Sequence, residues 1–139
     1  MLGVLRVSRA FAPVLGKNGG GALLNVLSVA SFLNSPPLST YAASKAAAWS
    51  LTNGLRTELA AQGTQVLGLH VGFLETEMAK DVTAPKSDPA VVVGLAFDAL
   101  AAGKSEVFAD EFSLQVKRGL SAEKAPYLGG HAREGVVKS

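Results

Sequence analysis

The sequence predicts an α/β fold, a partial doubly wound parallel sheet of about three strands with flanking helices. Short, almost continuous apolar runs alternate with longer segments of helical apolar spacing. Such runs are typical of strands buried on both faces, and their alternation with helices indicates parallel strands joined by crossovers. Three strands make a thin sheet, and the chain opens on a helix, so we expect further strands upstream.

The elements follow one another between turns rich in glycine or proline. The predicted helices cover residues 2–15, 41–61, 88–102 and 111–119, and the predicted strands cover residues 22–29, 64–71 and 105–110. Ser39 or Thr40 can cap the second helix, and Gly63 can end it. Together these elements predict one domain over residues 1–120, followed by a loose tail over 121–139.

Composition and charge predict a soluble globular chain. Of the 139 residues, 48% are hydrophobic and 17% are charged, unlike a disordered tail. The net charge of +2 is too small to indicate nucleic acid or a membrane surface. No apolar run reaches the ~18 residues that a membrane span needs, so we expect a cytoplasmic protein. An acid-free start containing Arg6 and Arg9 leaves a transit peptide as a distant alternative.

Cysteine and histidine usage predicts no metal site. The absence of cysteine excludes disulfides, thiolate metal ligands and a cysteine nucleophile. The two histidines, His70 and His131, lie far apart in the sequence. His70 falls in an apolar run, and we expect it to be a hydrogen-bonded residue near a strand end.

The segment STYAASKAAAWS, residues 39–50, contains a candidate catalytic pair. Tyr41 and Lys45 are four residues apart, so they share one face of a helix. A free phenol is a weak acid near neutral pH, and a nearby ammonium group stabilises its charged form. Taken alone, the pair is better explained as two polar residues on a solvated helix face.

Ser28 favours the chemical interpretation. It ends the apolar run 22–28, and ligands of open parallel sheets bind at the carboxyl ends of strands. Its hydroxyl could hydrogen-bond a substrate oxygen that gains negative charge. A serine that merely closes a strand is the alternative.

Together these residues resemble the short-chain dehydrogenase/reductase family. That family has a serine at a strand end and then Tyr-x-x-x-Lys at the start of the next helix, matched here by Ser28, Tyr41 and Lys45. GALLNVLSVAS and YAASKAAAWSLTNGLRTEL look like its serine strand and catalytic helix. HVGFLETEM resembles its Pro-Gly-x-x-x-Thr segment, with Val71 where proline is usual. The resemblance covers about residues 2–110.

The resemblance implies an oxidoreductase that interconverts a carbonyl and a secondary alcohol with NAD or NADP. Tyr41 would exchange a proton with the substrate oxygen, and Ser28 would orient that oxygen. Lys45 would favour the phenolate of Tyr41 and hydrogen-bond the nicotinamide ribose. The backbone around Gly72 and Leu74, with the Thr76 hydroxyl, would face the nicotinamide carboxamide. The cofactor-binding residues that the resemblance implies are therefore Tyr41, Lys45, Gly72, Leu74 and Thr76.

The same resemblance implies a lid and an assembly surface. Residues 73–86 would form the lid over a small-molecule substrate that is at least partly apolar. The family commonly assembles through helices like 2–15 and 41–61, which implies a homo-oligomer. Trp49 could lie at that interface or be a partly exposed aromatic.

The family's dinucleotide-binding half has no counterpart in this sequence. GKNGGG, residues 16–21, is the only glycine cluster, and it follows a helix and precedes a strand. Phosphate-binding turns have the reverse order, so we interpret it as a surface turn. The alternative function is therefore a truncated, non-catalytic remnant that cannot bind cofactor and at most associates with other subunits. The choice between NAD and NADP cannot be predicted from this half.

Overall fold

The computed structural model describes residues 2–72 and 88–128. Its helices are α1 (Leu2–Lys17), α2 (Ser39–Leu59), α3 (Pro89–Ala101) and α4 (Glu111–Arg118). Its strands are β1 (Gly21–Ser28), β2 (Thr64–Val71) and β3 (Glu106–Phe108). Short 3-10 turns cover Val29–Ser31, Pro36–Leu38, Ala60–Gln62 and Pro126–Leu128.

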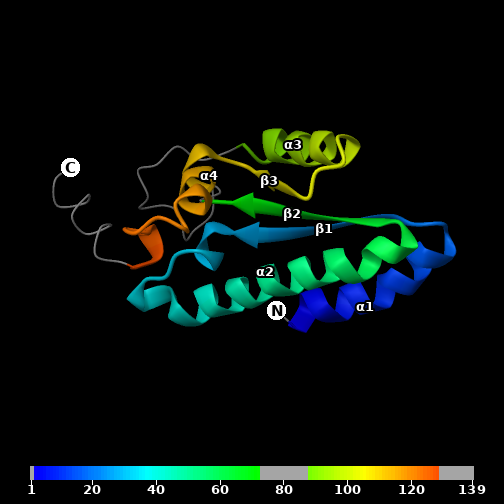
Figure 1. The fold of residues 1–139 in the computed structure, drawn as a ribbon, viewed down its shortest axis with the longest axis horizontal. Coiled ribbons are helices and arrows are strands. Elements are labelled where there is room, and N and C mark those ends of the chain that lie inside the picture. The colour runs from blue at the N-terminus through cyan, green and yellow to red at the C-terminus, as the bar shows by residue number, and fades with distance from the viewer. Residues whose placement is uncertain (1, 73–87, 129–139) are drawn as a thin grey trace.

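The three strands form one parallel sheet in the order β1-β2-β3. Gly21 pairs with Thr64 and Ser28 with Val71, so β1 and β2 end together. Figure 1 shows α1 and α2 on one face of the sheet and α3 on the other. The predicted α/β architecture is therefore confirmed, and β1 is an edge strand within the described part of the chain.

Apolar side chains hold α2 and α3 on opposite faces of β2. On the α2 face, Leu55 and Leu59 pack against Val66. On the α3 face, Leu69 and Val71 pack against a cluster that contains Val92 and Ala96. Each large apolar side chain buried in this way contributes roughly 1.5–3 kcal/mol to folding. The alternation along β2 thus fixes which face of the sheet each helix covers.

The turn formed by the GKNGGG segment lies at the amino ends of the strands. Gly20 has a φ of 107°, a backbone conformation that favours glycine. A side chain at Gly20 would also bring its Cβ within 2.5 Å of the Gly63 carbonyl oxygen. This turn therefore packs closely against the connection at Gly63, at the end of the sheet where the strands begin.

Two local predictions differ from the structure. Neither Ser39 nor Thr40 caps α2, because the 3-10 turn Pro36–Leu38 runs directly into the helix. The Ser39 hydroxyl donates instead to the Pro36 carbonyl at 3.3 Å. The last strand is shorter than 105–110, because Asp110 caps α4.

Three further observations concern Trp49, membrane-spanning helices and the segment after residue 120. Trp49 does not stand free on α2, since its ring packs edge-on against Phe32 with ring centroids 5.0 Å apart. Within residues 2–72 and 88–128, no helix is long and apolar enough to cross a membrane. Ala125, in the segment predicted as a tail, is buried, and the division at residue 120 stays a prediction.

Candidate active site

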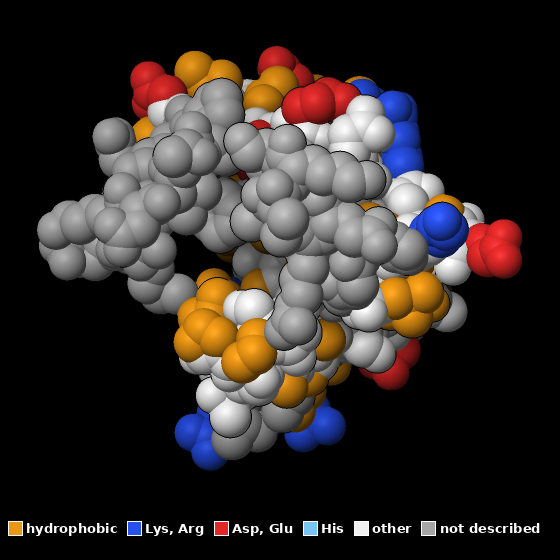
Figure 2. All heavy atoms as spheres, turned by 90° about the vertical axis from the view of Figure 1, so that its left-hand side faces the viewer, with side chains coloured by type: hydrophobic (Ala, Val, Ile, Leu, Met, Phe, Trp, Pro, Cys, Tyr) orange, Lys and Arg blue, Asp and Glu red, His pale blue; other side chains and the backbone are white. Residues whose placement is uncertain are grey.

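Two of the residues predicted from the sequence, Ser28 and Gly72, lie where β1 and β2 end. Ser28 closes β1 and is paired with Val71, so Gly72 follows directly on the neighbouring strand. Figure 2 faces this edge of the molecule, with hydrophobic side chains gathered in its lower half, on the side of α2. The register of two parallel strands therefore brings Ser28 and Gly72 together at the carboxyl end of the sheet.

Tyr41 and Lys45 share one face of the first turns of α2. The Lys45 ammonium nitrogen lies 5.6 Å from the centroid of the Tyr41 ring, within the range of a cation–π contact. Tyr41 is 38% exposed and Lys45 is half-buried, so solvent or a ligand can reach the phenol. Helical spacing thus delivers the tyrosine–lysine pair that the sequence predicted.

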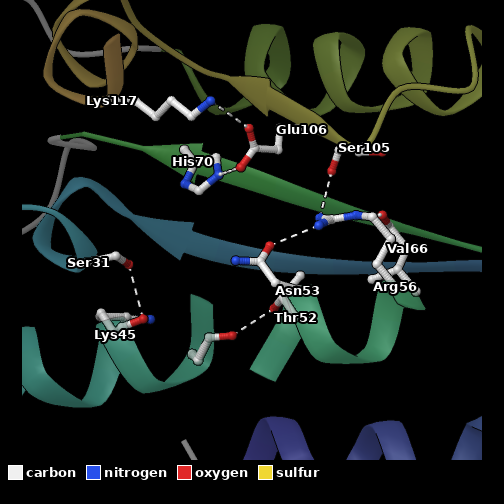
Figure 3. Close-up of polar contacts among 11 residues, drawn as sticks. Ser31, Lys45, Thr52, Asn53, Arg56, Val66, His70, Ser105, Glu106 and Lys117 are labelled. Carbon is white, nitrogen blue, oxygen red and sulfur yellow. Dashed lines mark hydrogen bonds and ion pairs between the residues drawn. The ribbon is translucent and has the colours of Figure 1, made fainter. Parts of the chain in front are cut away.

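The connection from β1 to α2 is held by two serine hydroxyls. The Ser28 hydroxyl oxygen accepts from the backbone N–H of Ala30 at 3.0 Å, and within residues 2–72 and 88–128 its own proton forms no hydrogen bond. The Ser31 hydroxyl donates to the Lys45 carbonyl at 3.0 Å (Figure 3). These bonds tie the segment after Ser28 to the turn of α2 that carries Lys45.

Gly72 is fixed by a residue that the sequence analysis did not select. Its backbone N–H donates to Oδ2 of Asp110 at 2.7 Å, and Oδ1 of Asp110 accepts from the N–H of Ser113 at 2.7 Å. A Cβ on Gly72 would lie 2.6 Å from the Asp110 carboxylate. A side chain at position 72 would therefore require the Asp110 carboxylate to shift, and this carboxylate accepts the hydrogen bond of the Gly72 amide.

Other predicted site residues lie outside the described residues. These are Leu74, Thr76 and the lid segment 73–86. A shallow groove of about 130 Å³ runs beside the first turns of α2, between the segment 30–34, Ala42, Ala46 and Tyr127. Neither Ser28 nor Tyr41 lines that groove, so it is not part of the candidate site.

Polar side chains inside the fold also fix α2 against the sheet. Asn25 of β1 donates to the Thr52 hydroxyl at 3.0 Å, and both side chains are buried. Arg56 donates to the carbonyls of Val66 at 3.1 Å and Ser105 at 3.0 Å (Figure 3). An amide inside the apolar run of β1 was the only signal in the sequence for this network.

A partly buried polar cluster of His70, Glu106 and Lys117 lies where β2, β3 and α4 meet. The Nε2 of His70 lies 3.2 Å from Oε1 of Glu106, and the Lys117 ammonium lies 3.4 Å from Oε2 (Figure 3). The hydrogen bond to His70 lowers the pKa of Glu106 from 4.5 to about 2, and the nearby charges assist it against the cost of burial. His70 is therefore a hydrogen-bonded residue near a strand end, as its sequence context indicated.

This carboxylate makes the fold sensitive to acid. Because the pKa of Glu106 is lower in the folded chain, its contribution is complete above about pH 4.5 and is lost as pH falls toward 2. The free energy of unfolding should fall between neutral pH and about pH 3, and Glu106→Gln should make this fall smaller by about 1–2 kcal/mol. Urea unfolding at both pH values measures this difference. The exposed Glu123→Gln is the control, and an equal change in both variants would contradict the assignment.

Comparison with known proteins identifies the family of the chain. A family model described as short chain dehydrogenase matches residues 1–87 of the chain. The chain belongs to the short chain dehydrogenase family. The fold of the described residues is shared with solved members of that family.

Individual relatives match the chain over part of their length. A short chain dehydrogenase from Burkholderia cenocepacia, solved with NADP, shares 36% identity and a TM-score of 0.81 over 95% of this chain and 54% of its own. The uncharacterized oxidoreductase YgfF of Escherichia coli is 55% identical over 65 residues, which are 45% of this chain and 26% of that protein. Gluconate 5-dehydrogenase of Gluconobacter oxydans is 36% identical over 81 residues, 58% of this chain and 32% of that protein. The chain thus spans about half of the Burkholderia protein and about a third or less of these curated relatives.

Proposed function

We propose that the chain carries the catalytic half of an NAD(P)-dependent oxidoreductase that interconverts a carbonyl and a secondary alcohol. The observation that carries this proposal is the Lys45 ammonium, 5.6 Å from the ring of Tyr41 at the start of α2. Ser28, at the end of β1, has a hydroxyl proton that forms no hydrogen bond with any of the described residues. These groups are the ones that a proton transfer to an alkoxide oxygen requires.

Each of these side chains has a defined task in the proposed reaction. Tyr41 gives its phenol proton to the substrate oxygen as that oxygen gains negative charge, and takes it back in the oxidation. Lys45 and the amino-terminal end of α2 both stabilise the resulting phenolate. The hydroxyl of Ser28 donates to the same substrate oxygen and holds it in place. The substrate is a small carbonyl compound or alcohol, and the compartment that we propose is the cytoplasm.

The residues of this chain fit one end of the cofactor only. When bound, the cofactor supplies the hydride. Lys45 and the edge near Gly72 would hold its nicotinamide and ribose. Within the described residues, no strand–turn–helix forms a phosphate cradle, and the glycine-rich turn at 16–21 lies at the opposite edge of the sheet. The pyrophosphate and adenine therefore need a binding half that the described residues do not supply.

Titration of the 139-residue chain with NADPH, followed by NADPH fluorescence, tests the proposal. We expect weak, saturable binding of NADPH with a Kd of about 1 mM, because the chain offers a site only for the nicotinamide end of the cofactor. Lys45→Met should weaken this binding, and Lys104→Met, which replaces an exposed lysine outside the site, should leave it unchanged. A folded chain with no binding that depends on Lys45 would instead favour the second function.

That second function is a non-catalytic remnant of the family. It is favoured by one observation, namely that the chain spans about half of the Burkholderia enzyme it resembles. In this case the chain would keep its fold and associate with other subunits without turnover. Activity restored by adding a separately produced dinucleotide-binding half would contradict it.

We also propose that the chain associates with a second copy through α1 and α2. Val7, Phe11 and Val14 form an exposed apolar stripe on α1, each about half exposed. On α2, the small residue Gly54 has open space around its Cα, so another helix can approach it closely. The apolar stripe of α1 and the small-residue position of α2 lie on the same face of the sheet. Such a surface can pack against a second copy of itself.

Phe11→Asp should convert such a dimer into a monomer. The new carboxylate would be buried without a partner, which costs several kcal/mol and outweighs a typical interface contact. Sedimentation velocity measures the change. Phe97→Asp is the matched control, because Phe97 is 67% exposed on α3, on the other face of the sheet. If Phe97→Asp is a monomer and Phe11→Asp is still a dimer, the interface is on α3 and the proposed α1 and α2 interface is wrong.

A further inference from the structure

His70 is a buried polar residue that the proposed reaction does not use. Its side chain is 0% exposed and is stacked on Phe108, with ring centroids 4.8 Å apart and planes 12° apart. Its Nδ1 has no hydrogen-bond partner within the described part of the chain. Burying an imidazole in this way is costly, and an apolar side chain could fill the same space. The residue therefore requires an explanation other than packing.

On the outer side of His70, a pair of charges fixes the ring. Glu106 accepts from Nε2, and Lys117 of α4 pairs with the second oxygen of the same carboxylate. An ionised carboxylate can only accept, so Nε2 of His70 must carry a proton. Figure 3 shows the Lys117 and Glu106 side chains meeting above His70, which leaves one orientation for the imidazole.

On the inner side, the His70 ring touches the segment that leads from Ser28 into α2. Phe32 packs against His70 with ring centroids 5.2 Å apart, and its other side meets the edge of Trp49. Trp49 lies one turn after Lys45 on α2, and Ser31 donates to the Lys45 carbonyl. Contacts therefore run without interruption from α4 and β3 to the turn of α2 that carries Lys45.

We propose that His70 is a positioning residue, oriented by Glu106 and Lys117, whose ring holds Phe32 and so sets the segment between Ser28 and Lys45. The titratable and charged groups that face it within the described residues are Glu106 from β3 and, behind that, Lys117 from α4. The catalytic part of this role rests on the proposed function. The coupling between the ion pair and the aromatic contacts does not, because it can be measured without cofactor or turnover.

The unmodified chain provides the first test. His70 and His131 are the only histidines, so ¹⁵N labelling of histidine gives two assignable rings. Two-bond ¹⁵N–¹H correlation spectra should show His70 with its proton on Nε2 and none on Nδ1. A proton on Nδ1 with a bare Nε2 would overturn the proposal, because Glu106 could then not orient the ring.

The second test uses Trp49, the only tryptophan, as a reporter of its contact with Phe32. Neither Glu106→Met nor Lys117→Met replaces a residue in ring contact with Trp49. If His70 transmits their effect, each variant should raise acrylamide quenching of Trp49, on the order of twofold for Glu106→Met and less for Lys117→Met. The control is Arg118→Met, an exposed charge on the same turn of α4, which should leave quenching unchanged.

Two outcomes separate positioning from a purely structural role. If far-UV circular dichroism shows a folded variant that is less stable but has unchanged Trp49 quenching, the ion pair only fastens α4, and the proposal fails. Lys117 is 40% exposed, so Lys117→Met provides this comparison if Glu106→Met does not fold. In a form of the protein that turns over, both variants should lower kcat more than they raise KM. Unchanged kcat there would overturn the positioning role, whereas a wild-type chain that never turns over would count against the proposed function instead.

Discussion

Tyr41→Phe is expected to lower kcat by about 10²–10⁴-fold in any form of the protein that reduces a ketone. The variant keeps the ring and its contact with Lys45 and loses only the phenol oxygen that exchanges the proton. Binding of NADPH should change little, since the hydroxyl acts on the substrate oxygen. Steady-state kinetics together with an NADPH titration measures the two effects separately.

A matched control for this variant is present in the chain. Tyr127 is the only other tyrosine; it is exposed and lines the groove beside the first turns of α2, which neither Ser28 nor Tyr41 lines. Tyr127→Phe should leave kcat unchanged. Turnover that survives in Tyr41→Phe would eliminate the proton-transfer role, and with it the central element of the proposed mechanism.

Lys45→Met is expected to lower kcat/KM by about 10²-fold and to move the pH–rate profile to higher pH. Methionine preserves the length and packing of the half-buried stem and removes the charge beside the Tyr41 ring. Without that charge the phenolate becomes more costly to form, so the oxidation direction requires a more alkaline solution. Rates measured across the pH range, with saturating cofactor, give the displacement.

The direction of this displacement is the decisive observation. A profile that falls in height but keeps its position would mean that Lys45 serves only to bind the cofactor. Lys45→Arg should preserve most of the position, because it retains the charge, even though its planar group hydrogen-bonds the ribose differently. The pair of variants therefore separates the electrostatic task of Lys45 from its binding task.

The parts of the fold that follow from local patterns could be predicted from the sequence. Apolar spacing located α1, α2 and α3 within about two residues at their ends, because the side of a helix or strand that is buried sets its period. Tyr41 and Lys45 are a local pair, since four residues of helix suffice to bring them together. The edge shared by Ser28 and Gly72 follows from the parallel pairing of two buried runs.

Contacts that depend on register could not be predicted in the same way. Asp110 meets Gly72 across 38 positions of the sequence, and Glu106 meets His70 across 36. Whether these side chains meet depends on the pairing of Gly68 with Glu106, which no spacing within β2 or β3 reveals. The segment SEVFAD predicted only a short strand. Nothing in its sequence indicated that Asp110 caps α4 or that Glu106 hydrogen-bonds with His70.

The position of β1 at the edge of the sheet has a consequence for the behaviour of the isolated chain. Within the described residues, β1 hydrogen-bonds only to β2, and its Val26 side chain is 51% exposed. Its sequence, GALLNVLS, contains neither a charged residue nor a proline that would discourage pairing with another molecule. Edge-to-edge extension of the sheet would therefore compete with the native monomer at high concentration. Aggregation, rather than unfolding, is expected to set the upper concentration at which this chain can be handled alone.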